Sequence, residues 1–158
     1  MKIVTIQNKK DEKFLRHPVA LFNFKIFSKK DIKDLVQRMR KSMQEAEGIG
    51  LSANQIGLDM KVFVARVENK FYAVFNPEIV QFSSAILQIE EGCLSVPGIY
   101  GSVERPERVT LKGRDINDKP IKIKAWGLLA RVFQHELDHL DGKLFIDRTK
   151  KLSAISKS

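Results

Sequence analysis

The chain has 158 residues, of which 43% are hydrophobic and 30% are charged. This length suffices for one compact domain that buries about 70% of the surface of its unfolded chain, so no disulfide staples are needed. The single cysteine, Cys93, excludes an intramolecular disulfide and fits a reducing compartment. No stretch approaches the roughly 18 apolar residues of a membrane span, and the first ten residues lack the apolar run of a signal peptide. We therefore expect one domain over 1–158, located in the cytoplasm, or in an organelle if a presequence has been removed.

Lysine and arginine total 28 against 19 acidic residues, which gives a net charge of +9. Such a charge can attract nucleic acid or the ribosome. However, the basic residues are spread along the chain, with only three Lys-Lys pairs and a short basic tail at about 150–158. We therefore expect no specific nucleic-acid recognition and no membrane partner, and a transient contact with the ribosome surface stays open.

The first strong element is a helix that begins after Ser28. Ser28 and Asp31 have the spacing of a capping box, and apolar residues then recur at helical intervals. Gly48 is the expected end of this helix, because glycine readily adopts the left-handed conformation that terminates helices. The apolar stripe consists of Ile32, Leu35, Val36, Met39, Met43 and Ala46.

The middle of the chain is strand-like. Residues 61–67 and 70–75 flank Glu68-Asn69 and predict a hairpin. Residues 108–112 and 120–125 predict a second pair, in which isoleucine alternates with lysine as in a sheet with one buried face.

A second helix is expected from Trp126 to Asp141, with Gly142 as its cap. The order of elements predicts an α+β fold: antiparallel strands packed around this central helix, with a further helix on the N-terminal side.

This second helix carries His135-Glu136-Leu137-Asp138-His139. Histidines four apart project from one face of a helix, so both imidazoles can reach one metal ion. The HExxH pattern also places Glu136 where it can act on a metal-bound water. Two histidines at this spacing are often ordinary surface or core residues, but the adjacent glutamate and the core-facing stripe favour a metal site.

A catalytic site of this kind usually has three protein ligands, and Cys93 is the natural third. A lone cysteine is most often a small buried apolar residue. Here it follows Glu91-Gly92 and precedes a turn marked by Pro97 and Gly98, a setting that can expose a thiolate beside a backbone N–H.

A third segment, residues 48–57, is rich in glycine and contains Gln55. It is not a dinucleotide-binding fingerprint, because its third glycine is misplaced. Gln55 could be an ordinary loop residue, or its carboxamide could donate a hydrogen bond to a developing oxyanion.

Together these segments resemble the three signature motifs of the peptide deformylases. The motifs are GIGLSANQIG at 48–57, EGCLSVP at 91–97 and QHELDH at 134–139, in the family's order and approximate separation. The flanking residues 75–77 and 142–145 are also similar to the family, so the resemblance covers nearly the whole chain. It implies an enzyme that removes the N-terminal formyl group from the formyl-methionine of nascent polypeptides and releases formate.

The resemblance also implies roles for particular residues. Cys93, His135 and His139 would hold one divalent ion, Fe(II) in the cell, with zinc, nickel or cobalt able to occupy the same ligands in isolated protein. Glu136 would be the general base, and Gln55 with the backbone N–H of Leu94 would stabilise the oxyanion.

The substrate site needs an apolar pocket for methionine near the metal ligands. Each candidate for this pocket could equally be plain core, and the two glycines could let the substrate backbone approach closely. Many family members have arginine where this chain has Tyr100, so Tyr100 bears on substrate preference, and Arg105 is a candidate to take over part of that role. The expected substrate-binding residues are Ile49, Gly50, Ile89, Gly92, Tyr100, Leu128 and Val132.

Three alternative functions compete with this interpretation. A zinc endopeptidase of the HExxH class needs a further ligand downstream, but no histidine follows His139. A basic RNA- or ribosome-binding protein with a structural metal would need a fourth protein ligand, and His17 lies in a loop-like segment where we expect it to be exposed. An inactive deformylase-like binder is disfavoured because all the expected catalytic residues are present.

Overall fold

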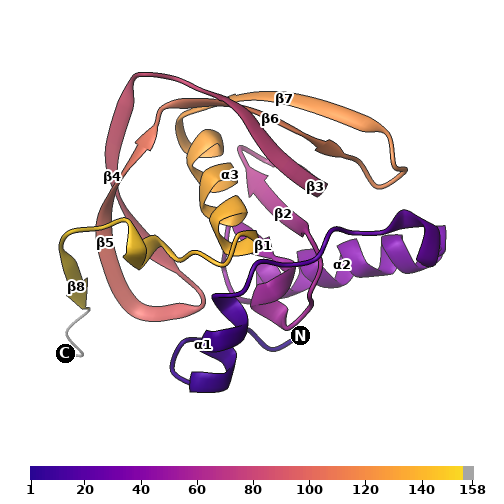
Figure 1. The fold of residues 1–158 in the computed structure, drawn as a ribbon, viewed down its shortest axis with the longest axis horizontal. Helices are drawn as coiled ribbons and strands as arrows, with labels where there is room; N and C mark the ends of the chain where they lie inside the picture. The colour runs from indigo at the N-terminus through magenta and orange to yellow at the C-terminus, as the bar shows by residue number, and fades with distance from the viewer. Residues whose placement is uncertain (155–158) are drawn as a thin grey trace.

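The computed structural model describes residues 1–154 and contains helices packed between and beside two antiparallel sheets (Figure 1). One sheet has the strand order β1-β2-β3-β6-β7, and the other has the order β4-β5-β8. The elements are α1 (Lys9–Leu15), η1 (Phe24–Ile26), α2 (Lys29–Glu45), β1 (Gly50–Ser52), η2 (Ala53–Ile56), β2 (Val62–Val67), β3 (Lys70–Phe82), β4 (Ile86–Cys93), β5 (Val96–Pro106), β6 (Arg108–Arg114), β7 (Pro120–Trp126), α3 (Gly127–Leu140), η3 (Phe145–Asp147) and β8 (Leu152–Ala154).

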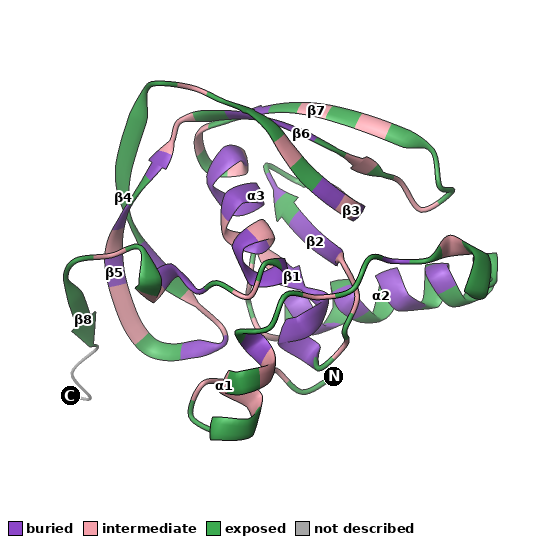
Figure 2. Cartoon of the chain, in the orientation of Figure 1, coloured by how far each residue is buried: buried purple, intermediate pink, exposed green. Residues whose placement is uncertain are grey.

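Helix α3 lies at the centre, with strands of both sheets against it (Figure 1). Most of its residues are buried, as the purple segments of Figure 2 show. Ala130, Phe133 and Leu140 pack with the inner face of the larger sheet in one apolar cluster. The predicted α+β fold, with antiparallel strands around a central helix, is confirmed.

Helix α2 covers a second apolar cluster, together with β1 and β2. It begins as predicted, because Ser28 and Asp31 form a reciprocal capping box. The predicted end is wrong. The helix ends at Glu45, and Glu47 takes the left-handed conformation with φ 55°. Gly48 instead supplies the N–H that closes the turn on the carbonyl of Met43, at 2.9 Å.

The predicted hairpin between β2 and β3 is confirmed, and Val67 pairs with Lys70 across its turn. Glu68 and Asn69 both have positive φ, as a tight type I′ turn requires. Strand β3 continues to Phe82, seven residues beyond its predicted end. The hairpin of β6 and β7 and the Gly142 cap of α3 are also as expected.

Two further expectations from the sequence concern a membrane span and the basic tail. Within residues 1–154, none of the helices combines the length and apolar character needed to cross a bilayer. The predicted basic tail falls partly outside the described residues: Lys150 and Lys151 are exposed, and 155–158 lie beyond them.

Candidate metal centre and active site

The candidate centre lies where α3 meets the turn between β4 and β5. The Sγ of Cys93 is 3.1 Å from Nε2 of His139, and that nitrogen is 3.2 Å from Nε2 of His135. All three ligand atoms lie within 4.8 Å of one another. Bonds of about 2.0–2.1 Å to nitrogen and 2.3 Å to sulfur place ligands of a tetrahedral ion roughly 3.3–3.6 Å apart. The three donors therefore converge closely enough to fit one divalent ion.

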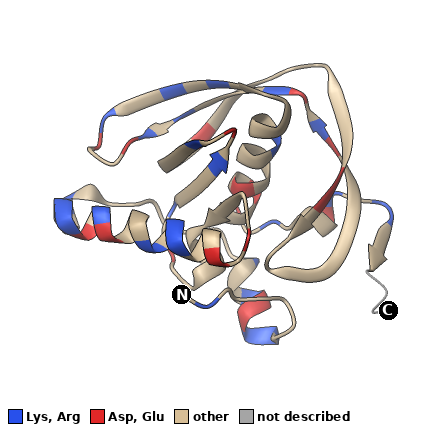
Figure 3. Ribbon diagram, turned by 180° about the vertical axis from the view of Figure 1, so that it is seen from behind, with Lys and Arg blue, Asp and Glu red and all other residues tan. Residues whose placement is uncertain are grey.

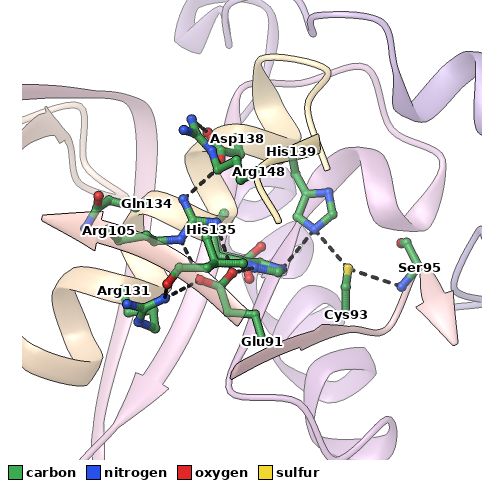
Figure 4. A network of polar contacts seen from close by, with 12 residues as sticks. Glu91, Cys93, Ser95, Arg105, Arg131, Gln134, His135, Asp138, His139 and Arg148 are labelled. Carbon is green, nitrogen blue, oxygen red and sulfur yellow. Dashed lines mark hydrogen bonds and ion pairs between the residues drawn. The ribbon is translucent and has the colours of Figure 1, made fainter. Parts of the chain in front are cut away.

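Glu91 fixes the orientation of His135, as Figure 4 shows. Its Oε1 is 2.8 Å from Nδ1 of His135, which leaves Nε2 directed at the centre. Burial would raise the pKa of Glu91, but hydrogen bonds from His135 and Arg105 outweigh burial and hold that pKa below its ordinary value. Glu91 is therefore a carboxylate that accepts from the histidine.

Two arginines bind Glu91 directly, and a third joins the same network through Asp138. Arg105 donates to both Glu91 oxygens, at 2.6 and 2.9 Å, and Arg131 donates to Oε2 at 2.6 Å. Arg105 also reaches Asp138 at 2.9 Å, and Arg148 donates to both oxygens of Asp138. This network joins β4, β5 and α3 around the candidate metal ligands (Figure 4).

Arg105 therefore does not have the substrate-site role for which the sequence made it a candidate. Its side chain is only 3% exposed and is fully engaged with Glu91 and Asp138. Arg105 does not line the pocket. It therefore cannot take over the role of the arginine that many family members have at the position of Tyr100.

Glu136 follows His135 on α3 and is buried, at 3% exposure. The Ser52 hydroxyl donates to its Oε2 at 2.6 Å. Burial raises the pKa of the Glu136 carboxyl, and a raised pKa is common for carboxyl groups that exchange protons near neutral pH. A Cβ at Gly50 would collide with this carboxylate, so the missing side chain makes room for Glu136.

Gln55 is held with its amide nitrogen toward the centre. Its Oε1 accepts from the Ser52 backbone N–H at 2.9 Å, while Nε2 donates to Ser95 Oγ at 3.2 Å and lies 3.6 Å from Cys93 Sγ. The same short segment positions α3, because Asn54 donates to the His139 carbonyl at 2.6 Å.

The thiol of Cys93 is in an environment that favours the thiolate. Burial raises its pKa, but the neighbouring His139 and His135 outweigh burial and lower the pKa well below that of an ordinary thiol. A bound cation acts in the same direction.

A pocket of about 370 Å³ opens beside these groups. Ile49, Ile89 and Leu128 are 44–53% exposed there, so they are not plain core, whereas Val132 is buried at the base. A Cβ at Gly92 would meet the Tyr100 ring, which leans over that glycine. Of the residues expected in the site, only His139 does not line this pocket. The expected residues that do line it are Ile49, Gly50, Gln55, Ile89, Gly92, Cys93, Leu94, Tyr100, Leu128, Val132, His135 and Glu136.

Sequence reasoning missed Arg131, Asp138 and the anchoring role of Glu91. Glu91 stood within the second motif, and the need of a metal-bound histidine for a carboxylate partner was the signal that could have identified it. The prediction that His17 is exposed is confirmed.

The site thus combines three converging donors, a buried carboxylate and an open, largely apolar pocket. This arrangement suits a hydrolase that works with a single metal ion.

Comparisons with known proteins identify the family. The family model described as polypeptide deformylase matches residues 1–154. Peptide deformylase 2 of Gloeobacter violaceus is 45% identical over 131 residues, which cover 80% of this chain and 70% of that protein. The peptide deformylase of Natranaerobius thermophilus is 48% identical over 119 residues, covering 75% and 76%.

Solved structures agree with this result. A peptide deformylase of Synechococcus elongatus in complex with actinonin gives a TM-score of 0.86 at 36% identity, covering 96% of this chain and 79% of that one. The Thermotoga maritima peptide deformylase also gives 0.86, at 34% identity, covering 95% and 97%. The chain belongs to the polypeptide deformylase family, whose members are hydrolases that remove N-terminal formyl groups from nascent polypeptides. The resemblance read from the sequence is confirmed.

Proposed function

We propose that residues 1–158 act as one catalytic domain that cleaves formyl-methionine at the N-terminus of peptides and releases formate, using one divalent ion. The observation that carries this proposal is the convergence of Cys93, His135 and His139 next to the buried carboxylate of Glu136, with an open pocket beside them.

When bound, the ion supplies a Lewis acid and lowers the pKa of water from about 15.7 toward 7. Glu136 takes the proton from the attacking water and later delivers it to the departing amine nitrogen. Gln55 Nε2 and the backbone N–H of Leu94 donate hydrogen bonds to the tetrahedral oxyanion. The Ser52 hydroxyl, 2.6 Å from Glu136, holds the base in place.

The donor set bears on the identity of the metal. One thiolate and two imidazoles favour soft or borderline ions over magnesium and calcium. We propose Fe(II) as the ion used in the cell, with zinc, nickel or cobalt able to bind the same ligands in purified protein.

The pocket supports methionine as the first residue. Ile49, Ile89, Leu128 and Val132 supply an apolar lining next to the ligand cluster. Tyr100 lies at the same opening, where it can contact the residues that follow. We further propose that the enzyme works in the cytoplasm or an organelle, where formylated nascent chains occur, with at most a transient contact with the ribosome surface.

The direct test is formate release from a formyl-Met tripeptide by protein purified without oxygen. We expect turnover with Fe(II) or Ni(II), loss of turnover after chelation and recovery when the ion is restored. Tight binding of one metal per chain without formate release would contradict the proposed substrate.

Replacing Gln55 by alanine tests the oxyanion role. Loss of one such donor raises the barrier by about 2.7–4 kcal/mol, so kcat should fall roughly 10²- to 10³-fold. Metal content should be unchanged, because Gln55 is not a ligand. Asn117→Ala, in the exposed turn between β6 and β7, is a control that should leave kcat unaltered. An unchanged kcat in Gln55→Ala would contradict the assignment.

A further inference from the structure

The hairpin of β6 and β7 carries a row of positive charge on its outer face. The side chains of Ile121, Ile123 and Ala125 turn inward to the core, so the alternate positions of β7 face solvent. The blue segments that recur along this hairpin in Figure 3 belong to that row. We call it the basic hairpin face and define it by five exposed residues: Arg108, Lys112, Arg114, Lys122 and Lys124.

This charge does not serve the stability of the sheet. Lys112 lies directly opposite Lys122 in the register, and like charges in that position destabilise a strand pair. Glu78 is the register partner of Lys112 on the other side, yet it is not within ion-pair distance. Among residues 1–154, the one ion pair that involves the face joins Arg114 to Asp118, at 3.9 Å. Within the described residues, most of these cations therefore have no anionic partner, and an anionic ligand could supply one.

An exposed aromatic side chain stands at one end of the face. Trp126 is 71% exposed and is the register partner of Arg108. Arg108, Lys124 and Trp126 line a shallow hollow of about 560 Å³, which also includes the 60% exposed Phe82. Cations that flank a large exposed aromatic ring form a surface on which a base can stack while its phosphates are neutralised.

We propose that the basic hairpin face binds a single-stranded segment of RNA. Strand geometry of about 3.4 Å per residue makes the row from Arg108 to Arg114 roughly 20 Å long, and two paired strands make it about 5 Å wide. This narrow track fits a linear polyanion. An anionic bilayer would need a broader face with more apolar side chains to insert, and an acidic peptide would give Trp126 no ring on which to stack.

The track ends near the candidate active site. Trp126 immediately precedes α3, and Leu128, two residues later, lines the pocket. RNA held on the face would therefore place whatever it carries close to the pocket mouth, without occupying the pocket itself.

The test is fluorescence anisotropy of a labelled 12-nucleotide single-stranded RNA with the metal-loaded full chain. Lys112→Gln/Lys122→Gln/Lys124→Gln should weaken binding roughly tenfold and reduce the slope of log K against log salt by about 2, since each phosphate contact contributes about 0.7. The matched control removes the same charge from α1, as Lys9→Gln/Lys10→Gln/Lys13→Gln, and should bind as the wild type does. Hydrolysis of a formyl-Met tripeptide should be equal in all three proteins.

Three further variants separate binding from folding. Trp126→Ala should weaken RNA binding more than Trp126→Phe, which retains a ring. Lys122→Glu should raise Tm by roughly 1–3 °C, because it relieves the repulsion with Lys112, and still weaken RNA binding. No RNA binding at low salt, equal weakening by the α1 control, displacement by polyglutamate as effective as by RNA, or preference for phosphatidylglycerol vesicles would each overturn the proposal.

Discussion

Replacing Glu136 by glutamine should abolish nearly all turnover while leaving the metal in place. Glutamine keeps the size of the side chain and can still accept from the Ser52 hydroxyl, so the pocket should keep its shape. It cannot take a proton, and loss of a general acid–base typically reduces kcat by about 10²- to 10⁴-fold. The measurement is kcat for formate release, with metal content determined on the same sample.

The pH profile provides a second measurement on this variant. The proposed base can take a proton only when it is deprotonated, and burial raises the pKa of Glu136, so the wild-type rate should climb as the pH rises through that pKa. The residual rate of Glu136→Gln should lack this acid limb. Glu104→Gln removes an exposed carboxylate from β5 and should retain both rate and profile. Near-normal turnover by metal-loaded Glu136→Gln would sink the assignment of the base.

Local chemistry explains why much of the fold could be predicted. Ser28 with Asp31 begins α2, Gly142 ends α3, and Glu68-Asn69 makes the turn between β2 and β3. In each case the residues that determine the conformation are adjacent in the chain, so their preferences act without help from distant contacts.

The missed elements depend on partners far away in the chain. Strand β1 is only three residues long and starts with a glycine, and it is a strand because Gly50 to Ser52 pair with Phe63 to Ala65 of β2. Strand β5 contains Pro97, Gly98 and Gly101, which favour turns, yet β4 on one side and β8 on the other hold it extended. Propensity alone could not anticipate either strand.

The candidate site shows the same division. The residue types and their helical spacing predicted His135, His139 and Glu136 as site residues, because that chemistry requires few residues in a fixed local pattern. Arg131 gave no such signal, since arginine on a helix is usually exposed. Its three acceptors, Glu91, Val103 and Leu87, lie 28 to 44 residues away in sequence and come together only in the folded chain.

Replacing Arg105 by methionine should destabilise the fold by about 3 kcal/mol, at the lower end of the range for breaking a buried ion pair. Arg105 is the side chain that joins Glu91 on β4 to Asp138 on α3. Without it, both carboxylates stay buried, and only Arg131, His135 and Arg148 remain to compensate them. Urea denaturation at pH 7 gives the free energy of unfolding. Arg148→Met, whose side chain is 41% exposed, should lose under about 1 kcal/mol.

The pH dependence of that difference identifies its cause. The pKa values of Glu91 and Asp138 are both lowered in the folded chain. A lowered pKa contributes stability that is complete above the ordinary pKa of about 4 and is lost as the pH falls through the folded value. Because Arg105 helps to lower both pKa values, the gap between wild type and Arg105→Met should narrow below about pH 4. A gap that is constant with pH would mean that Arg105 stabilises by packing its hydrocarbon stem, and the network would then orient His135 without contributing charge stabilisation.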